Sequence, residues 1–193
     1  MDKVRNHPKI GDRIKVQPIR CIEDVNRVKV LLRNNVRDLA LFSLGVNSAL
    51  SPSALLHVRV GVVRNLRPGD SFEINGKSVT VNKSIKETID KLLSAMSVVE
   101  DSDFLFQSKK LAGQPLGAST LHRLVKTWCA DANLTGNFGS HSLRKTYGYI
   151  YRTTFKADLG QLARIFNHAY KRQTVDYLCL PQEELHSICM QEI

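Results

Sequence analysis

The segment that most restricts the fold is residues 36–49, in which most positions are apolar. A helix that is apolar on all sides needs neighbours on all sides, because an uncovered face would leave apolar surface in water. The segment therefore predicts a buried central helix. Apolar residues at helical spacing predict further helices around it, at about 22–33, 53–59, 85–96 and 121–129. A capping box over Ser84–Glu87 predicts the start of the third of these.

One segment alternates between apolar and polar residues instead of repeating with a helical period. The apolar positions flank Asn75-Gly76, a dipeptide typical of a two-residue hairpin turn, and are Phe72, Ile74, Val79 and Val81. The sequence thus predicts a mainly α fold with a small antiparallel β-sheet, in the α+β class.

The domain organisation follows from length and composition. The chain has 193 residues, enough for one domain with a substantial core. Residues 1–20 are polar and contain proline, which predicts a loose N-terminal leader. We expect the domain itself over 21–180 and a C-terminal tail over 181–193.

Several classes of protein are disfavoured by what the sequence lacks. It has no apolar stretch that could span a bilayer and no signal-peptide pattern, which predicts a cytoplasmic protein without a membrane partner. Its cysteines are scattered and form no Cys-x-x-Cys motif: Cys21, Cys129, Cys179 and Cys189. We therefore expect free thiols, no disulfide framework and no zinc site.

Positive charge is concentrated in two parts of the chain. The net charge is +10, and residues 1–70 hold 13 Lys and Arg against 6 Asp and Glu. Residues 107–177 hold 11 against 3, whereas residues 71–106 hold 4 against 6. This distribution favours a polyanionic partner, for which double-stranded DNA is our prediction. Charge alone also allows RNA or an anionic membrane surface.

A first group of candidate functional residues lies in Gly139–Thr146. Ser140 is placed as a helix N-cap, and a buried stripe follows it: Leu143, Tyr147 and Ile150. A different face then carries His141, Arg144 and Lys145. An imidazole and a guanidinium one turn apart at a helix start can both meet an anion that the helix N-terminus favours. The alternative is the solvated face of an ordinary amphipathic helix.

A second group follows in Phe166–Leu178. We expect a short helix whose buried side includes Leu162, Ile165 and Phe166, with His168 just after its end. Tyr177 lies in a further helical stretch beginning near Lys171. Taken singly, such a histidine is more often a core or cap residue, and such a tyrosine is more often a packing residue.

The order and spacing of these residues resemble a known family, the tyrosine recombinases or phage integrases. His-x-x-Arg at 141–144 is followed by His168 after 24 residues and by Tyr177 after nine more. The sequence segments around them, Ser-His-Ser-Leu-Arg-Lys-Thr and Gln-Thr-Val-Asp-Tyr-Leu, also resemble the sequence motifs, or boxes, of the family. The resemblance covers roughly residues 22–180. It implies the DNA breaking-rejoining fold of the integrase catalytic domain.

The resemblance also implies a role for each residue. Tyr177 would attack a phosphodiester to give a 3′-phosphotyrosyl link, while Arg144 and His168 hold the phosphoryl oxygens. His141 would act as acid and base. Lys77, next to the hairpin turn, would protonate the leaving 5′ oxygen, although a surface lysine placed for solubility is the alternative. The family needs neither metal nor nucleotide cofactor. DNA contacts are expected from the neighbouring Lys145, Lys171 and Arg172.

The chain departs from the family in its first box. Ser51 stands where the first catalytic arginine is expected, and Ala54 stands where an acidic residue is expected. Losing one contact to charge that develops in a transition state typically costs about 3 kcal/mol. Activity should then be impaired unless another cation takes over. Candidates by position are His57, Arg59, Arg64 and Arg67.

Two functions remain open at this point. The first is a recombinase that breaks and rejoins DNA, and the second is a non-enzymatic DNA-binding relative that acts at recombination sites. The protein would work as a homo-oligomer on DNA or beside an active recombinase. Only about twenty residues precede the first predicted helix, which leaves no room for the N-terminal clamp domain of most relatives. We therefore expect weak binding with little sequence preference.

Overall fold

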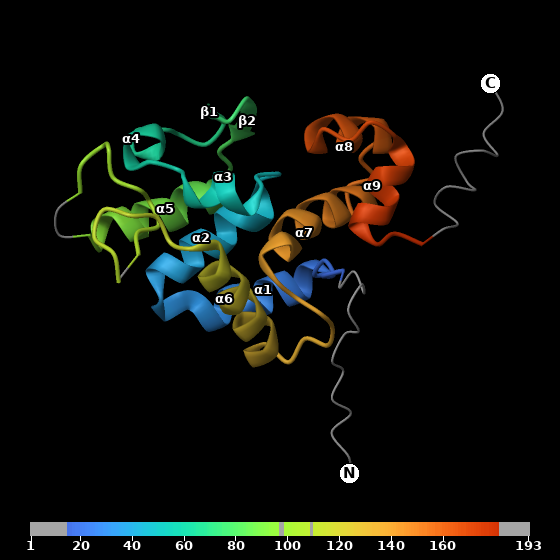
Figure 1. Cartoon of the computed structure of the whole chain (residues 1–193), viewed down its shortest axis with the longest axis horizontal. Coiled ribbons are helices and arrows are strands. Elements are labelled where there is room, and N and C mark those ends of the chain that lie inside the picture. Colours follow the sequence, from blue (N-terminus) through green and yellow to red (C-terminus); the bar gives the residue numbers. More distant parts are fainter. Residues whose placement is uncertain (1–14, 97–98, 109, 182–193) are drawn as a thin grey trace, which may run out of the picture.

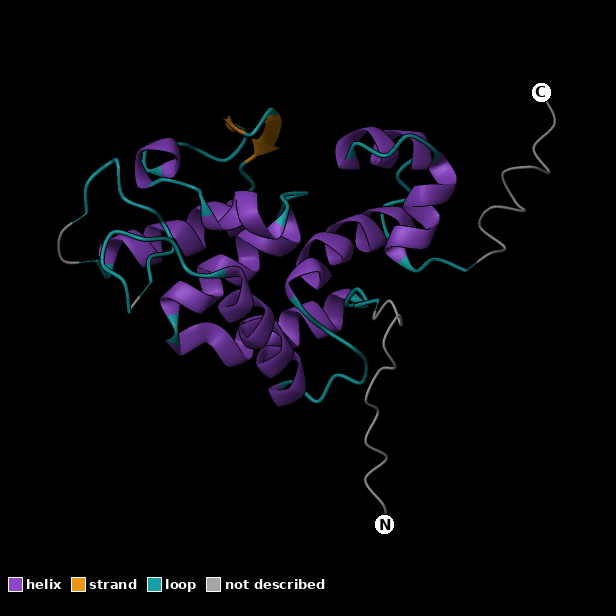
Figure 2. Cartoon of the chain, viewed as in Figure 1, coloured by secondary structure: helices purple, strands orange, loops and turns teal. Residues whose placement is uncertain are grey.

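The computed structural model describes residues 15–96, 99–108 and 110–181. Figures 1 and 2 show an assembly of helices with one small β-hairpin at its edge, as the sequence predicts. The elements before the hairpin are α1 (Ile22–Leu31), η1 (Leu32–Asn34), α2 (Val36–Asn47), α3 (Pro52–Leu56) and α4 (Val60–Val63). The hairpin and the later helices are β1 (Ser71–Ile74), β2 (Lys77–Thr80), α5 (Lys83–Ser94), α6 (Ala118–Asp131), α7 (Ser140–Thr153), α8 (Leu159–Phe166) and α9 (Lys171–Leu178).

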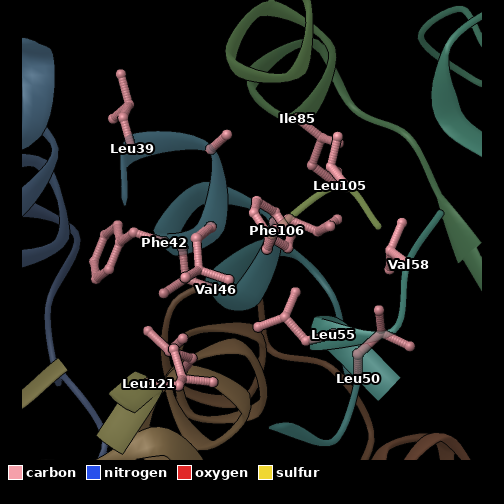
Figure 3. Packing of buried hydrophobic residues seen from close by; sticks show 14 of the residues in the cluster. Leu39, Phe42, Val46, Leu50, Leu55, Val58, Ile85, Leu105, Phe106 and Leu121 are labelled. Carbon is pink, nitrogen blue, oxygen red and sulfur yellow. The ribbon is translucent and has the colours of Figure 1, made fainter. Parts of the chain in front are cut away.

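Helix α2 is the centre of the main core, as the apolar segment predicts. It packs against α5 and α7, and its residues from Asp38 to Val46 are all buried. Figure 3 shows Phe42 and Val46 of this helix among side chains from other elements, including Phe106 and Leu121. The one charged residue in this stretch, Asp38, accepts a hydrogen bond of 3.3 Å from Trp128 Nε1 and pairs with Arg37. A buried carboxylate is thus satisfied inside the core.

The hairpin forms as predicted, with Phe72 opposite Val79 and Ile74 opposite Lys77. Asn75 and Gly76 have φ angles of 50° and 69°, so both central residues of the turn are left-handed. This is the turn whose twist matches that of two antiparallel strands. Phe72 and Val79 are buried, so the hairpin is fixed to the domain by one face.

Two predicted helix starts are wrong by one or two residues. Helix α5 is capped by Asn82, whose side chain accepts from Ile85 N at 2.9 Å, and not by Ser84. Helix α7 is capped by Gly139, and Ser140 is its first residue. A Cβ atom at Gly139 would overlap the ring of His122, so close packing against α6 explains a glycine here.

Helices α8 and α9 form a second, smaller core against α7. Its buried residues are Leu159, Leu162, Phe166, Val175, Leu178 and Leu180. Ile165, expected on this buried side, is 40% exposed, because only part of the short helix faces α7 and α9. Figure 1 shows α7 running from the main core toward α8 and α9. This helix therefore connects the two cores.

Part of the predicted leader packs on this arrangement. The Ile19 side chain is buried, and its backbone N–H donates to Thr146 Oγ1 at 2.8 Å. Gln17 N–H donates to Asn137 O at 2.7 Å. Residues 15–20 thus lie against α7 and the loop before it. Residues 1–14, and 182–193 of the predicted tail, lie outside the described residues.

The contact between the two cores depends on Gly148 in α7. A Cβ atom there would lie 2.6 Å from the Phe166 ring and 2.7 Å from Leu178 Cδ2. We expect Gly148→Ala to lower the free energy of unfolding by about 1–3 kcal/mol, because buried rings would have to shift. Urea denaturation measures the change. Gly117→Ala is the control, since its Cβ would meet nothing closer than 3.9 Å. Equal stability of the two variants would contradict this packing.

Candidate active site

The position of His168 is set by the way α8 ends. Asn167 adopts a left-handed conformation with φ 57°, which stops the helix, and His168 N–H returns to donate to Ala163 O at 2.8 Å. This is the pattern of a helix C-terminus closed by a left-handed residue. The His168 ring then lies with Nδ1 3.0 Å from Thr174 Oγ1 of α9. Thr174 is fully buried, so the imidazole is oriented between the two helices.

The C-terminal end of α8 brings together two of the predicted cations. Arg144 Nη2 of α7 donates to Phe166 O at 3.1 Å, and Lys77 Nζ of the hairpin donates to Ile165 O at 3.0 Å. The last carbonyls of a helix have no partner within the helix and carry partial negative charge. They hold a lysine and an arginine from distant parts of the sequence on one helix end.

Tyr177 lies in an aromatic cluster beside these cations. Its ring centroid is 5.5 Å from that of Phe166 and 5.2 Å from that of His168. Arg144 Cζ lies 5.0 Å from the centroid of Phe166, and Lys145 Nζ lies 5.0 Å from the centroid of Tyr177. The structure thus brings Arg144, His168, Tyr177 and Lys77 together around the end of α8.

Two polar atoms of this cluster have no hydrogen-bond partner in the part of the chain that the structure describes. Among the described residues, the buried side-chain N and O atoms without a hydrogen bond are Ser43 Oγ, Arg144 Nε and Tyr177 Oη. Leaving such a group unpaired costs about 1–3 kcal/mol. Arg144 Nε, a donor, and Tyr177 Oη, a hydroxyl, both belong to the predicted site. This is the expected arrangement of groups whose partner is a ligand.

Burial and mutual repulsion shift the protonation of the cluster. Burial raises the pKa of Tyr177 to about 12, and the Arg144 charge opposes this rise. Burial first, and then the charge of Arg144, lowers the pKa of Lys77. The pKa of His168 is also lowered, by burial and then by Arg144 and Lys77. The site therefore favours a neutral imidazole and a lysine that gives up its proton more readily than usual.

His141 shares a hollow with Tyr177. The two residues line a hollow of about 560 Å³ together with His122, Lys145 and five further residues from α7, α9 and the segment before α1. Burial, and then the charges of Arg144, Lys145 and His122, lowers the pKa of His141. His122 belongs to no motif, so no pattern in the sequence indicates its place here.

The predicted DNA contacts differ in their exposure. Lys171 and Arg172 are exposed in the first turn of α9. Lys145, expected on an open face with His141, is 5% exposed, and its Nζ donates to Val16 O at 2.8 Å. It turns inward because residues 15–20 cover that side of α7. To reach DNA its ammonium group would have to leave this partner.

Ser51 has a structural role at the start of α3. Its side chain accepts a hydrogen bond from Ala54 N at 3.2 Å and caps the helix, and Ala54 is buried. Ser51 and Ala54, which the sequence predicts to stand at the charged positions of the first box, are thus a helix cap and a core residue. An N-cap side chain is short and bonded to its own backbone, so Ser51 supplies no charge to the site.

Three of the four possible substitutes for the first arginine are held elsewhere. Arg59 Cζ lies 4.4 Å from the Phe104 ring centroid, and Arg59 also donates to Ser102 O. Arg64 pairs with Asp101 at 3.2 Å and donates to Val99 O at 2.7 Å. His57 Nδ1 is 2.7 Å from Ser53 O. Arg67, the fourth, has an exposed side chain.

The lowered pKa values predict acid sensitivity of the fold. The unfolded chain binds more protons than the folded chain below the ordinary histidine pKa of about 6.5, so stability should fall as pH drops through this value. Thermal unfolding at pH 7.5 and 5.5 measures the fall in Tm. It should be smaller in His168→Gln, whereas an equal fall in this variant and the parent would contradict the assignment.

The described residues show neither a metal centre nor a membrane span. No three or more histidine, cysteine, aspartate and glutamate side chains in this part of the chain are grouped so as to hold a metal ion. None of the helices described is long and apolar enough to cross a bilayer. Cys21, Cys129 and Cys179 are free thiols, and Cys189 lies outside the described ranges.

The chain is similar to known proteins in sequence and in structure. Residues 32–184 match the model of the phage integrase family. A probable integrase/recombinase, YoeC of Bacillus subtilis (strain 168), is 32% identical over 172 residues, which are 87% of this chain and 92% of the relative.

Solved structures agree on the fold. The XerA recombinase superposes with a TM-score of 0.70 at 17% identity, over 95% of this chain and 67% of that protein. XerH bound to a palindromic difH substrate in a post-cleavage complex gives 0.70 at 17% identity, over 92% of this chain and 53% of that one. The chain therefore spans about half to two thirds of these structures. With the family match over most of its length, it belongs to the phage integrase family of tyrosine recombinases.

Proposed function

We propose that this protein breaks and rejoins double-stranded DNA as a site-specific recombinase, through a covalent 3′-phosphotyrosyl intermediate on Tyr177. The observation that carries the proposal is the pair of buried, unpartnered groups Arg144 Nε and Tyr177 Oη, gathered with His168 and Lys77 at the end of α8. A phosphodiester offers an acceptor oxygen to the first and an electrophilic phosphorus to the second.

The proposed reaction forms one bond and breaks one. Tyr177 Oη attacks phosphorus, the bond from phosphorus to the 5′ oxygen breaks, and the 3′ side stays on the tyrosine. Arg144 and His168 hold the non-bridging oxygens, where negative charge grows. Because the phosphotyrosyl ester conserves the energy of the broken bond, a 5′ hydroxyl can reverse the step without a cofactor.

The proposed proton transfers follow from the shifted pKa values. His141 lines the same hollow as Tyr177, and its lowered pKa keeps it neutral and able to accept the phenol proton. Lys77 has a lowered pKa and so is a better acid toward the leaving 5′ oxygen. DNA binding brings phosphate charge to Arg144 and Lys77, which are held by carbonyl oxygens in the free protein.

One observation favours a second candidate function. Ser51 caps α3, and His57, Arg59 and Arg64 are held by other groups, so of the residues expected to supply the first-box charge only the exposed Arg67 is left among the described residues. A relative that binds recombination sites without cutting them, beside an active recombinase, would tolerate this loss. The solved neighbours include recombinases bound to DNA and a lambda integrase dimer on its core site, which supports DNA as the partner in either case.

A trapping experiment distinguishes the two functions. The protein is incubated with a pool of nicked duplexes of randomised sequence, in which the fragment that carries the 5′ hydroxyl diffuses away after cleavage. A protein–DNA band that survives SDS supports the recombinase. Binding to the pool without such a band, under conditions in which an active family member forms one, supports the non-enzymatic relative.

DNA binding should depend strongly on salt in either case. Lys171 and Arg172 are exposed beside the site, and phosphate contacts of this kind release counterions. Raising salt from 50 to 200 mM should weaken binding by at least about tenfold if two or more phosphates are neutralised. Fluorescence anisotropy with a labelled duplex measures this. An affinity that does not change with salt would contradict an electrostatic interface.

A further inference from the structure

A second hollow lies between the hairpin and the C-terminal part of α8. It has a volume of about 510 Å³ and is lined by residues 75–79 of the hairpin, by Arg164, Ile165 and Asn167 around the end of α8, and by Ala49 and Leu50. The last two directly precede Ser51, so the hollow lies against the first box. Figure 1 shows the hairpin and α8 on the same side of the molecule.

The charges around this hollow are all positive. Its lining includes Lys77 and Arg164 and no aspartate or glutamate. Lys77 Nζ is bonded to Ile165 O, at the edge shared with Arg144. Within the described part of the chain, no hydrogen bond or ion pair involves the guanidinium group of Arg164, which lies in the last turn of α8. Arg164 is thus an exposed cation free to meet an anion.

The hollow adjoins the proposed active site. Lys77 and Arg144 bond to the carbonyls of Ile165 and Phe166, which are neighbours in the chain and follow Arg164 directly. Lys77 is also close enough to His168 to lower its pKa. An anion that reaches from Arg144 toward the hairpin would pass the end of α8, where Arg164 stands.

We propose that Arg164 supplies, from α8, the second guanidinium that Ser51 cannot supply to the scissile phosphate. The scissile phosphate would lie at the end of α8, between Arg144 and Tyr177 on one side and the hollow that Arg164 lines on the other. Arg164 then acts as a phosphate-binding residue of the reaction, since it touches the reacting group. This inference rests on the proposed recombinase function and names a residue outside the motifs of the family.

Cleavage of the randomised nicked pool provides the first test. Arg164→Ala should lower the rate of adduct formation by about 10- to 1,000-fold, as expected for one lost contact to transition-state charge. Arg164→Lys should lower the rate less, because lysine keeps the positive charge but cannot donate two parallel hydrogen bonds to a phosphate. Arg33→Ala is the matched control. Arg33 is an exposed arginine of η1, which joins α1 to α2 away from α8 (Figure 1).

Adding Ser51→Arg to Arg164→Ala gives the sharper result. If both positions bind one phosphate, the double variant should form the adduct at least tenfold faster than Arg164→Ala. Rates for Arg164→Ala equal to those for Arg33→Ala would overturn the proposal. So would a loss in DNA affinity with an unchanged rate on bound DNA, because Arg164 would then be an ordinary backbone contact.

A second readout does not depend on cleavage. Inorganic phosphate should raise the Tm of the parent protein relative to chloride at equal ionic strength, and Arg144→Ala and Arg164→Ala should each reduce this rise. Adding Ser51→Arg to Arg164→Ala should restore the rise in Tm. If no adduct forms but this pattern appears, the recombinase function fails and the phosphate site stands. If Arg164→Ala keeps the full rise, the site is wrong whatever the outcome of cleavage.

Discussion

Replacement of Tyr177 by phenylalanine is expected to abolish the covalent DNA adduct and to leave the stability of the fold unchanged. The change removes only the attacking oxygen, and the ring keeps its contacts with Phe166 and His168. The hydroxyl has no hydrogen-bond partner among the described residues, so its loss breaks no protein contact. Removing an unpaired buried hydroxyl should cost nothing in the free energy of unfolding and can stabilise by about 1 kcal/mol.

The control for this variant is Tyr170→Phe. Tyr170 lies seven residues earlier and is 75% exposed, so it tests whether a nearby phenol can replace the nucleophile. It should keep full adduct formation. Adduct formation by Tyr177→Phe, or a loss of stability well above 1 kcal/mol, would show that the hydroxyl has a structural role that the described contacts do not contain.

Replacement of Arg144 by lysine is expected to lower the rate of adduct formation by about 100- to 1,000-fold. Lysine keeps the charge but cannot present two parallel donors to a phosphate. Since Ser51 brings no charge to the site, the proposed mechanism assigns most of the phosphate binding to Arg144. Single-turnover rates on nicked DNA measure the effect.

The affinity for DNA separates catalysis from binding in the Arg144 variant. Exposed cations such as Lys171 and Arg172 remain, so affinity should fall by less than the cleavage rate. Circular dichroism should show an unchanged helical content. A rate within threefold of the parent would mean that Arg144 serves only to hold Phe166 O, the contact it makes in the free protein.

Patterns that depend on local sequence predicted most of the fold. The apolar run at 36–49 required a buried helix, and Asn75-Gly76 required a tight turn, because few backbone conformations suit either sequence. Helix starts were less certain, since Asn82 and Ser84 are both good caps and the choice depends on packing. The short helix α4, with only four residues, has no periodic signal at all.

For the candidate site, the sequence predicts a set of residues but not the surroundings of each side chain. Spacing identified Arg144, His168 and Tyr177, but burial of Lys145 depends on residues 15–20, which lie far away in the sequence. Arg59 and Arg64 are likewise held by groups that lie far away in the sequence, in residues 99–104. Long-range contacts decide which cations are free, and no local pattern records them.

Mass spectrometry of the trapped adduct tests the central claim most directly. After cleavage of the nicked pool, nuclease digestion and proteolysis, the peptide that retains a 3′-linked nucleotide identifies the nucleophile. The account predicts that the modified residue is Tyr177, in the peptide that follows Arg172. A nucleotide on Tyr147, Tyr149, Tyr151 or Tyr170, or the absence of any modified peptide while DNA is bound, would contradict it.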